Sequence, residues 1–261
     1  MPITRHLSGQ HAVVTGGGRG IGAAIVSELA RLGATVTLMG RDQRRLDAHA
    51  AQVARQHEVE TAAVVCDVTL PGSVSDAFGV ARETFGPPRI LVNNAGHAAA
   101  ASFTGTSLDA WNRAIAVNLT GAFLCMQQVL PAMVEAGRGR IVNVASVSGL
   151  KAYQMVAAYT ASKHGLIGLT RAVAAETARA GVTVNAVCPA YTSGTDMADA
   201  AERNLVAAGK SAAEARRMML RTIPRGTFIT PDEVAATVGF LCSAAASAIS
   251  GQAIVLAGGE P

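Results

Sequence analysis

The strongest constraint on the fold is a regular alternation of short apolar runs with longer amphipathic stretches. Runs that predict strands lie at 12–15, 34–39, 61–66, 89–93, 140–145, 182–188 and 252–256. Stretches with helical spacing lie between them, near 20–32, 42–57, 72–85, 108–135, 157–180 and 231–243. Strand and helix in alternation favour an α/β fold with a doubly wound, parallel, seven-stranded sheet and right-handed crossovers. Ligands of such sheets bind outside the carboxyl ends of the strands.

The length of the chain suits one domain, and we predict a single domain over 1–261. The 261 residues contain no internal repeat and no stretch with the composition of an interdomain linker. Half of the residues are hydrophobic and only 4% are aromatic, so small apolar side chains dominate the expected core. One irregular insert, 192–225, separates the last two predicted strands.

Charge and hydropathy argue against a nucleic-acid partner and against a membrane. The net charge is +4, and the basic residues are spread rather than gathered with aromatic residues into patches. The uncharged run 114–134 contains Asn118, two glutamines and a proline, so we expect a buried helix there rather than a membrane span. The N-terminus has no basic stretch followed by an apolar segment, so we expect no secretory signal.

The cysteines and histidines show no metal-binding spacing. The four cysteines are dispersed without a C-x-x-C pair, and the six histidines form no ligand pattern. Free core thiols in a reducing compartment explain the cysteines. We therefore expect no metal and a cytoplasmic location.

A glycine-rich turn follows the first predicted strand and leads into a helical pattern. It reads Gly16-Gly17-Gly18-Arg19-Gly20-Ile21-Gly22. Backbone N–H groups and the positive end of a helix dipole would face a ligand there, and glycine lets the backbone approach a pyrophosphate. The spacing is Gly16-x-x-x-Gly20-x-Gly22 rather than G-x-G-x-x-G, and a plain turn is the alternative. The strand before and the helix after favour a nucleotide site.

Tyr159 and Lys163 form a candidate acid–base pair. They are four residues apart in a helical stretch, so both side chains lie on one face. A nearby ammonium favours the phenolate and would lower the tyrosine pKa from its usual value of about 10. Such a tyrosine can exchange a proton with a carbonyl or alcohol oxygen. The alternative is a solvated surface pair.

These motifs occur together with Asn93-Asn94-Ala95-Gly96, Asn118 and Ser146, the last of which precedes Tyr159 by thirteen residues. In this order they resemble the short-chain dehydrogenase/reductase family, in its short single-domain branch, from about Leu7 to Gly259. The resemblance implies a Rossmann fold, a nicotinamide cofactor and hydride transfer between that cofactor and a ketone or secondary alcohol. It rests on the joint pattern, because each motif alone is common.

The resemblance also implies roles for four residues. Tyr159 would be the general acid in reduction and the base in oxidation, and Ser146 would bind the substrate oxygen. Lys163 would lower the Tyr159 pKa and bind the nicotinamide ribose. Asn118 would hold a water that links Lys163 to solvent, although an asparagine in a helix can also mark a kink. Ser148 and Tyr153 offer the same groups as Ser146 and Tyr159 without the family spacing.

The expected cofactor is NADP(H), with NAD(H) possible. By resemblance the discriminating position after the second strand is Gly40, which offers no carboxylate to the adenosine ribose. Arg41 and Arg19 would supply charge-assisted donors to a 2′-phosphate. Asp42 is the complication, since an acid near this point can bind a ribose; we interpret it as the N-cap of the following helix.

The remaining cofactor contacts also follow from the resemblance. Asp67 would hold the adenine amino group, with a strand-ending turn as its alternative role. The other expected contacts are Val68 at the adenine, Asn93, Asn94, Ala95 and Gly96 along the ribose path, and Pro189 with Thr192 or Thr195 at the nicotinamide. In this last segment Ala190 replaces the usual glycine and Thr195 comes one residue late, so we expect a different loop path and leave the choice of threonine open.

Substrate prediction rests on the 192–225 insert, which we expect to be a mobile lid. Its basic residues could bind phosphates of coenzyme A or an acyl carrier protein, or could simply lie on a solvated helix pair; they are Arg203, Lys210, Arg216, Arg217, Arg221 and Arg225. The likeness to 3-oxoacyl-acyl carrier protein reductases and 3-hydroxyacyl-CoA dehydrogenases favours a 3-oxoacyl thioester, and a cyclic or aromatic-pathway alcohol is the alternative. His97, Gln154 and Tyr191 would border the pocket.

We also considered two other classes of protein. A cofactor-sensing regulator would not need Ser146, Tyr159 and Lys163, and an extended epimerase or dehydratase would carry a second substrate domain. Resemblance further implies a homotetramer, paired through the helices near 108–135 and 157–180 and through the C-terminal strands.

Overall fold

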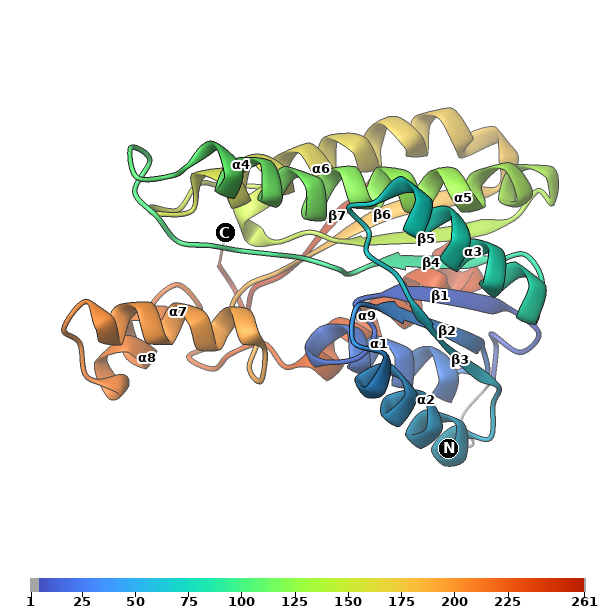
Figure 1. Ribbon diagram of the computed structural model, residues 1–261, viewed down its shortest axis with the longest axis horizontal. Coiled ribbons are helices and arrows are strands. Elements are labelled where there is room, and N and C mark those ends of the chain that lie inside the picture. Colours follow the sequence, from blue (N-terminus) through green and yellow to red (C-terminus); the bar gives the residue numbers. More distant parts are fainter. Residues whose placement is uncertain (1–4, 261) are drawn as a thin grey trace.

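A computed structural model describes residues 5–260, and its centre is a single parallel sheet of seven strands in the order β3-β2-β1-β4-β5-β6-β7. The strands are β1 (His11–Thr15), β2 (Thr35–Gly40), β3 (Thr61–Val65), β4 (Ile90–Asn93), β5 (Gly139–Val144), β6 (Val182–Pro189) and β7 (Ala253–Leu256). The predicted doubly wound α/β sheet is confirmed (Figure 1).

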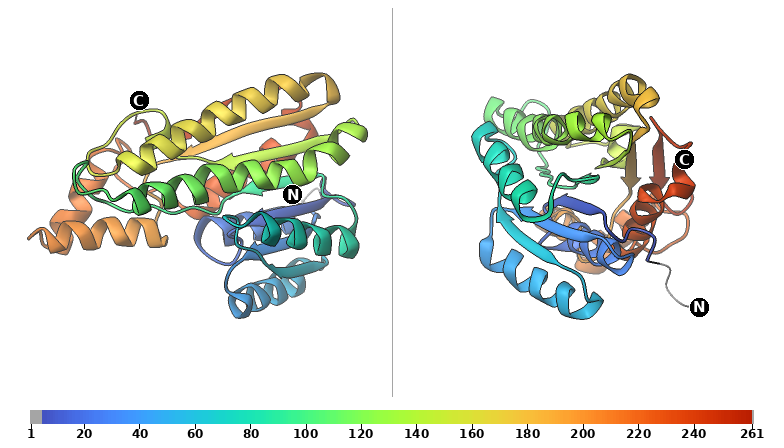
Figure 2. Two further views of the ribbon diagram at one scale, coloured as in Figure 1. Left: turned by 45° about the horizontal axis from the view of Figure 1, so that its top comes forward. Right: turned by 90° about the vertical axis from the view of Figure 1, so that its right-hand side faces the viewer.

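Helices cover both faces of the sheet (Figure 2). One layer holds α1 (Gly20–Arg31), α2 (Gln43–His57) and α9 (Pro231–Cys242); the other holds α3 (Pro71–Phe85), α4 (Leu108–Ile115), α5 (Gly121–Glu135) and α6 (Ala157–Thr177). Because both faces are covered, every residue of β1, β4 and β6 is buried, and most residues of these strands are apolar.

The predicted helix at 108–135 is continuous in direction but not in hydrogen bonding. A π-helical turn, Ala116–Thr120, separates α4 from α5 and contains Asn118. Single π turns often occur at functional sites. By length and composition Leu108–Glu135 could cross a membrane, yet it packs on the sheet and on α6, and 39% of its most apolar window is buried. The remaining surface exposes Trp111, Phe123 and Val134, so burial is less complete than we expected from the sequence.

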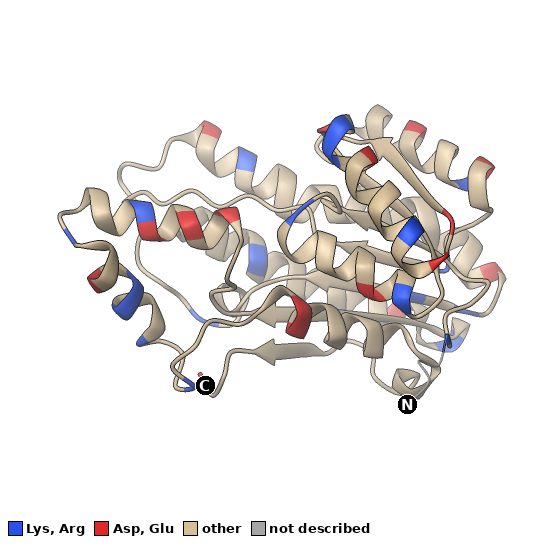
Figure 3. Cartoon of the chain, turned by 90° about the horizontal axis from the view of Figure 1, so that it is seen from below, with Lys and Arg blue, Asp and Glu red and all other residues tan. Residues whose placement is uncertain are grey.

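The insert before β7 forms a helical hairpin, α7 (Asp196–Ala207) and α8 (Ala212–Leu220), beyond the carboxyl edge of the sheet (Figure 1). Thr195 caps α7, and Ser211 with Glu214 forms a capping box on α8. In α7 only Ala198 is buried, so the hairpin makes few core contacts. Acidic residues predominate on α7 and basic residues on α8 (Figure 3).

The order in which strands are added to the sheet reverses between β1 and β4. These two strands are parallel neighbours, although β2 and β3 come between them in sequence. The glycine turn follows β1 and Asn94 follows β4, so both lie at this switch point. Ser146 follows β5 and Pro189 ends β6 at the same edge. Crevices at such points are where doubly wound proteins bind ligands.

Candidate active site

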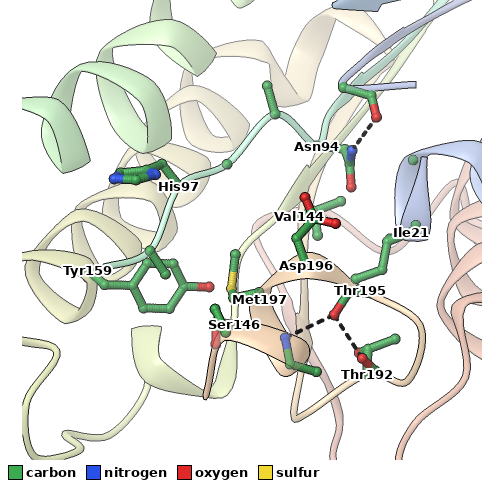
Figure 4. A pocket seen from close by; sticks show the side chains of 18 of the residues that line it. Ile21, Asn94, His97, Val144, Ser146, Tyr159, Thr192, Thr195, Asp196 and Met197 are labelled. Carbon is green, nitrogen blue, oxygen red and sulfur yellow. Dashed lines mark hydrogen bonds between the residues drawn. The ribbon is translucent and has the colours of Figure 1, made fainter. Parts of the chain in front are cut away.

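A cleft of about 790 Å³ opens at the carboxyl edge of the sheet, within the size range of small-molecule sites (Figure 4). It is lined by most of the residues that we assigned from the sequence to cofactor or substrate binding; Asn93 and the basic residues of the 192–225 insert are not among them. Those lining residues are Gly16, Gly18, Arg19, Gly20, Ile21, Gly22, Gly40, Arg41, Asp67, Val68, Asn94, Ala95, Gly96, Ser146, Gln154, Tyr159, Lys163, Pro189, Tyr191, Thr192 and Thr195.

The glycine turn forms a close-packed cradle. Gly16 and Gly20 have left-handed φ angles of 65° and 53°. A Cβ atom on Gly22 would lie 2.1 Å from the Gly16 carbonyl oxygen and 2.5 Å from Asn94 Nδ2, so no side chain fits there. The absence of a side chain at Gly22 therefore lets the turn pack closely against α1, and the glycines of the turn line the cleft, which suits the diphosphate of a dinucleotide.

Asn94 and Thr15 hold the turn in place. The Asn94 amide donates to the carbonyl oxygens of Thr15 and Gly16, both at 3.1 Å. The Thr15 hydroxyl accepts from the N–H groups of Asn94 and Ala95 at 3.0 and 3.1 Å. The Asn94 side chain therefore ties the end of β4 to the turn, rather than pointing freely at a ligand.

The second strand ends without a carboxylate at the cleft. A Cβ on Gly40 would meet no atom closer than Leu46 Cδ2 at 3.5 Å, and Arg41 and Arg45 line the cleft beside it. The Asp42 carboxylate accepts from the Arg45 N–H at 3.1 Å and caps α2, as we interpreted it, and Asp42 also lines the cleft. Arg19, which we expected to face a phosphate, instead forms an ion pair with Asp196 on α7.

Asp67 has the turn role that we gave as its alternative, and its contact with adenine stays a prediction. Its carboxylate accepts from the N–H and hydroxyl of Thr69 at 3.0 and 2.7 Å, closing the turn after β3, and the residue also lines the cleft. Burial works to raise the Asp67 pKa, but the hydrogen bonds from Thr69 and the charges of Arg41 and Arg113 lower it. The carboxylate is therefore ionised at neutral pH.

Ser146, Tyr159 and Lys163 meet at the inner wall of the cleft. Tyr159 and Lys163 leave only 7% and 3% of their surface exposed. Lys163 Nζ donates to the Val144 carbonyl oxygen at 2.7 Å and lies 5.7 Å from the centre of the Tyr159 ring. The Tyr159 and Ser146 side chains lie next to each other (Figure 4), and the Ser146 hydroxyl accepts from the Ser148 N–H at 3.1 Å.

The expected lowering of the Tyr159 pKa is wrong in this structure. Burial raises the Tyr159 pKa to about 12, although the hydrogen bond with Ser146 opposes the shift. Burial also lowers the Lys163 pKa to about 8, because the ammonium sits in the same dry pocket with a carbonyl rather than a carboxylate as its partner. Tyr159 thus holds its proton at neutral pH, as a proton donor must.

Asn118 does not line the cleft but is buried next to residues that do. Its side chain accepts from the His97 N–H at 2.8 Å, and it donates to the His97 carbonyl at 2.8 Å and to Ser162 Oγ at 2.9 Å. These bonds join the segment after β4 to α6. The π turn directs the side chain inward, in agreement with the kink alternative, and the proposed water remains a prediction.

The loop after β6 avoids a left-handed conformation at Ala190 and places it at Gly194, whose φ is 65°. The Thr192 hydroxyl donates to the Ala190 carbonyl at 3.0 Å, and the Thr195 hydroxyl donates to the Thr192 carbonyl at 2.8 Å. Both threonines line the cleft, so the choice between them stays open.

Several residues that line the cleft were not assigned to it from the sequence. Met197, Ala200, Ala201 and Asn204 lie on one face of α7, and their i, i+3, i+4, i+7 spacing was the signal that could have found them. Tyr153 and Glu260 carry no local signal, since only the fold brings them to the cleft. Among residues 5–260, no group of three or more His, Cys, Asp or Glu side chains could hold a metal ion.

A doubly wound sheet, a glycine cradle at its switch point and a serine–tyrosine–lysine group together define a dinucleotide-binding oxidoreductase site. Comparison with known proteins specifies the family. Residues 10–205 match the family described as short chain dehydrogenase. The chain is 38% identical to granaticin polyketide synthase putative ketoacyl reductase 1 of Streptomyces violaceoruber, over 95% of this chain and 92% of that protein.

A second relative is the 3-oxoacyl-(acyl-carrier-protein) reductase FabG of Aquifex aeolicus, with 38% identity over 97% of this chain and 98% of that protein. Among solved structures, a variant of actinorhodin polyketide ketoreductase with NADPH is similar, with a TM-score of 0.92, 36% identity and 96% coverage of both chains. The chain belongs to the short-chain dehydrogenase/reductase family and is an oxidoreductase of that family, as the sequence motifs predicted.

Proposed function

We propose that this protein reduces a ketone to a secondary alcohol, or performs the reverse oxidation, with NADP(H) as the preferred cofactor. The observation that carries the proposal is that the Ser146 and Tyr159 hydroxyls lie side by side on the wall of a cleft that also contains the glycine cradle. A carbonyl oxygen beside these hydroxyls would receive a proton from one while the other stabilises its negative charge.

The residues of the cleft fit a dinucleotide along its length. The backbone of the glycine turn would bind the diphosphate, Asp67 and Val68 the adenine, and Ala95 and Gly96 the ribose path. Lys163 would bind the nicotinamide ribose hydroxyls, and Pro189 with Thr192 or Thr195 would contact the nicotinamide. When bound, the cofactor supplies or accepts the hydride.

Proton transfer falls to Tyr159, which is protonated at neutral pH and can therefore act as the acid in reduction. A cationic Lys163 stabilises the phenolate that forms, and its pKa of about 8 lets it change protonation near working pH. Asn118 would hold the water that returns a proton from solvent.

The preference for NADP(H) rests on charge. Gly40 itself offers no carboxylate to repel a 2′-phosphate, and the Arg41 guanidinium lines the same part of the cleft. Arg45 and Asp42 also line it, and these two side chains pair with each other at 3.5 Å. NAD(H) is the second candidate, because Arg19 is engaged by Asp196. The NADPH in the ketoreductase structure named above supports the first.

The proposed substrate is a 3-oxoacyl thioester. The ketoacyl and 3-oxoacyl reductases among the relatives support it, as do the basic residues of the lid hairpin. Arg216 stacks on Phe228 and Arg225 pairs with Glu233, which leaves Arg203, Lys210, Arg217 and Arg221 as the phosphate-binding candidates. A cyclic or aromatic ketone is the second candidate, because Tyr153 and Tyr191 line the cleft and could stack on a ring.

The lid, the assembly and the location are part of the same proposal. The hairpin of α7 and α8 would move over the bound substrate as a lid. The exposed apolar residues of α4 and α5 would be covered in a homotetramer. We propose a cytoplasmic location, where the buried cysteines stay reduced.

The test is the oxidation of NADPH and, separately, of NADH by the purified protein with acetoacetyl-CoA. We expect turnover with NADPH, and we expect Tyr159→Phe to abolish it while binding of NADPH stays near normal. Turnover that survives in Tyr159→Phe would remove the central claim. If neither cofactor supports turnover although both bind, the thioester is wrong, and cyclic and aromatic ketones are the next substrates to test.

A further inference from the structure

Glu260, which follows β7, is a buried carboxylate that the proposed chemistry does not use. Its side chain is 6% exposed and lines the cleft. Oε1 accepts from the Tyr153 hydroxyl at 2.5 Å and from Lys151 Nζ at 2.8 Å, while Oε2 is buried with no partner in the described chain. Groups more than a hundred residues apart in sequence thus meet at one carboxylate, which we name the Glu260 anchor: Lys151, Tyr153 and Glu260.

The anchor holds one end of segment 150–156, which runs from the turn after Ser146 to the start of α6. This segment has no regular backbone ladder; at its other end the Met155 carbonyl accepts from the Ala101 N–H at 2.8 Å. Met155 has a φ of 67°, a left-handed conformation that disfavours a side chain of this kind. Strained backbone persists only where its surroundings fix it, so the anchor is one of the contacts on which the segment depends.

The residues just before Glu260 are hydrogen-bonded to two other parts of the chain near the cleft. The Gly258 carbonyl accepts from the Arg225 N–H at 2.9 Å, just after the lid hairpin, and the Leu256 carbonyl accepts from the Ala190 N–H at 3.0 Å. Burial and the Glu260 charge raise the pKa of Tyr191, so this residue is also near the carboxylate. Glu260 therefore sits where the loop after β6, the end of the lid hairpin and segment 150–156 come together.

The chemistry of the anchor makes it sensitive to a loss of the carboxylate. Burial, the hydrogen bond to Glu260 and the Glu260 charge raise the pKa of Tyr153, so its hydroxyl keeps the proton that it donates. Removal of the acceptor would leave that half-buried hydroxyl unsatisfied, which costs more than the bond itself contributes. The segment would then lose the contacts that hold it to the turn after β7. Gln154, the candidate substrate residue next to Tyr153, would move with it.

We propose that Glu260 is a positioning residue for the carbonyl substrate: through Tyr153 and Lys151 it fixes the wall of the cleft formed by segment 150–156. None of the three anchor residues belongs to the glycine cradle or to the second-strand edge, where the diphosphate and the adenosine of the dinucleotide would bind, and none is among the residues proposed to contact its nicotinamide. The effect should therefore fall on the substrate and spare the cofactor. This inference rests on the proposed function in one respect, namely that the cleft takes a carbonyl substrate.

The test compares Glu260→Ala with Glu260→Gln and with the control Glu233→Gln, which weakens a carboxylate–arginine pair outside the cleft. For acetoacetyl-CoA we expect Glu260→Ala to raise KM about tenfold or more, as the loss of a hydrogen bond to a charged group can do, with the Kd for NADPH within about twofold of the wild type. Glu260→Gln still offers an oxygen to the Tyr153 hydroxyl, so its KM should lie much closer to that of the wild type than to that of Glu260→Ala. An unchanged KM, or an equal change in KM and in the NADPH Kd, would overturn the proposal.

A measurement that needs no turnover separates this inference from the choice of substrate. Hydrogen–deuterium exchange of protein saturated with NADPH should be faster in 150–156 for Glu260→Ala and unchanged there for Glu233→Gln. If the wild type does not reduce acetoacetyl-CoA, the proposed substrate fails while the exchange result still decides the anchor. Exchange in 150–156 equal to that of the wild type would show that Glu260 does not hold the segment.

Discussion

A carboxylate introduced at Gly40 should invert the cofactor preference. Gly40 ends β2 at the cleft, and a Cβ there would make only an ordinary contact with Leu46 at 3.5 Å, so an aspartate fits without displacing the strand. The new carboxylate would accept hydrogen bonds from the ribose hydroxyls of NADH and repel the 2′-phosphate of NADPH. The glycine itself has no left-handed φ, so the substitution adds no backbone strain.

The size of the effect follows from the position of Gly40 at the partly exposed rim of the cleft. Two like charges about 5 Å apart at an effective dielectric constant of about 20 repel by about 3 kcal/mol, and salt roughly halves this near a surface. An energy of about 1.5 to 3 kcal/mol corresponds to a change of roughly 10- to 150-fold in the NADPH/NADH ratio of kcat/KM.

The assay is that ratio for the wild type, Gly40→Asp and Gly40→Asn, at low and at moderate salt. Asparagine has the same shape without the charge and is the matched control, so it should shift the ratio much less than aspartate. The aspartate effect should shrink as salt is added. Arg41→Asp should act in the same direction. A ratio within about twofold of the wild type in Gly40→Asp, or an equal shift in Gly40→Asn, would refute the electrostatic reasoning.

Two further predictions follow from the site. Asp42→Ala should lower the free energy of unfolding by about 1 kcal/mol through the lost N-cap and leave the NADPH/NADH ratio unchanged; a change in that ratio would make Asp42 a ribose ligand instead. Burial lowers the Lys163 pKa from 10.5 to about 8, so between these values the native state binds fewer protons than the unfolded state and this group's contribution to stability rises with pH. The free energy of unfolding of Lys163→Met, measured in urea, should therefore exceed that of the wild type by most below pH 8. This difference should narrow by roughly 1 to 3 kcal/mol as the pH rises to 10.5. A difference that stays constant with pH would contradict the buried, shifted lysine.

The elements of the fold were predictable because their signals are local. Strand β6 is buried at every position, and its mostly apolar sequence predicts this burial. Helix α6 begins where the helical spacing around Tyr159 begins. The bounds of α7 and α8 were not predicted and the insert was expected only as a solvated helix pair or a lid, since few of its residues are buried. The π turn at Ala116–Thr120 was not predicted, because no propensity separates it from the α-helix on either side.

The site was predictable where a residue's role depends on its type and its place after a strand. The glycine turn, Ser146 and Tyr159 line one cleft because parallel strands end at one edge of the sheet. Roles that depend on a distant partner were not predictable. Arg19 is engaged by Asp196, and Asn118 holds the His97 backbone; neither partner is marked by the sequence around these residues.

By itself, the sequence determined the alternation of strands and helices, the glycine turn and the order of the serine, tyrosine and lysine, because hydrophobic spacing and motif position are properties of neighbouring residues. Only the tertiary structure decided how dry the site is and which groups meet in it. Burial sets the pKa of Tyr159 to about 12, against the direction expected from Lys163 alone. Packing brings Glu260 to Tyr153 across 107 residues of sequence. Desolvation and long-range contact depend on the whole fold, so no local pattern could report them.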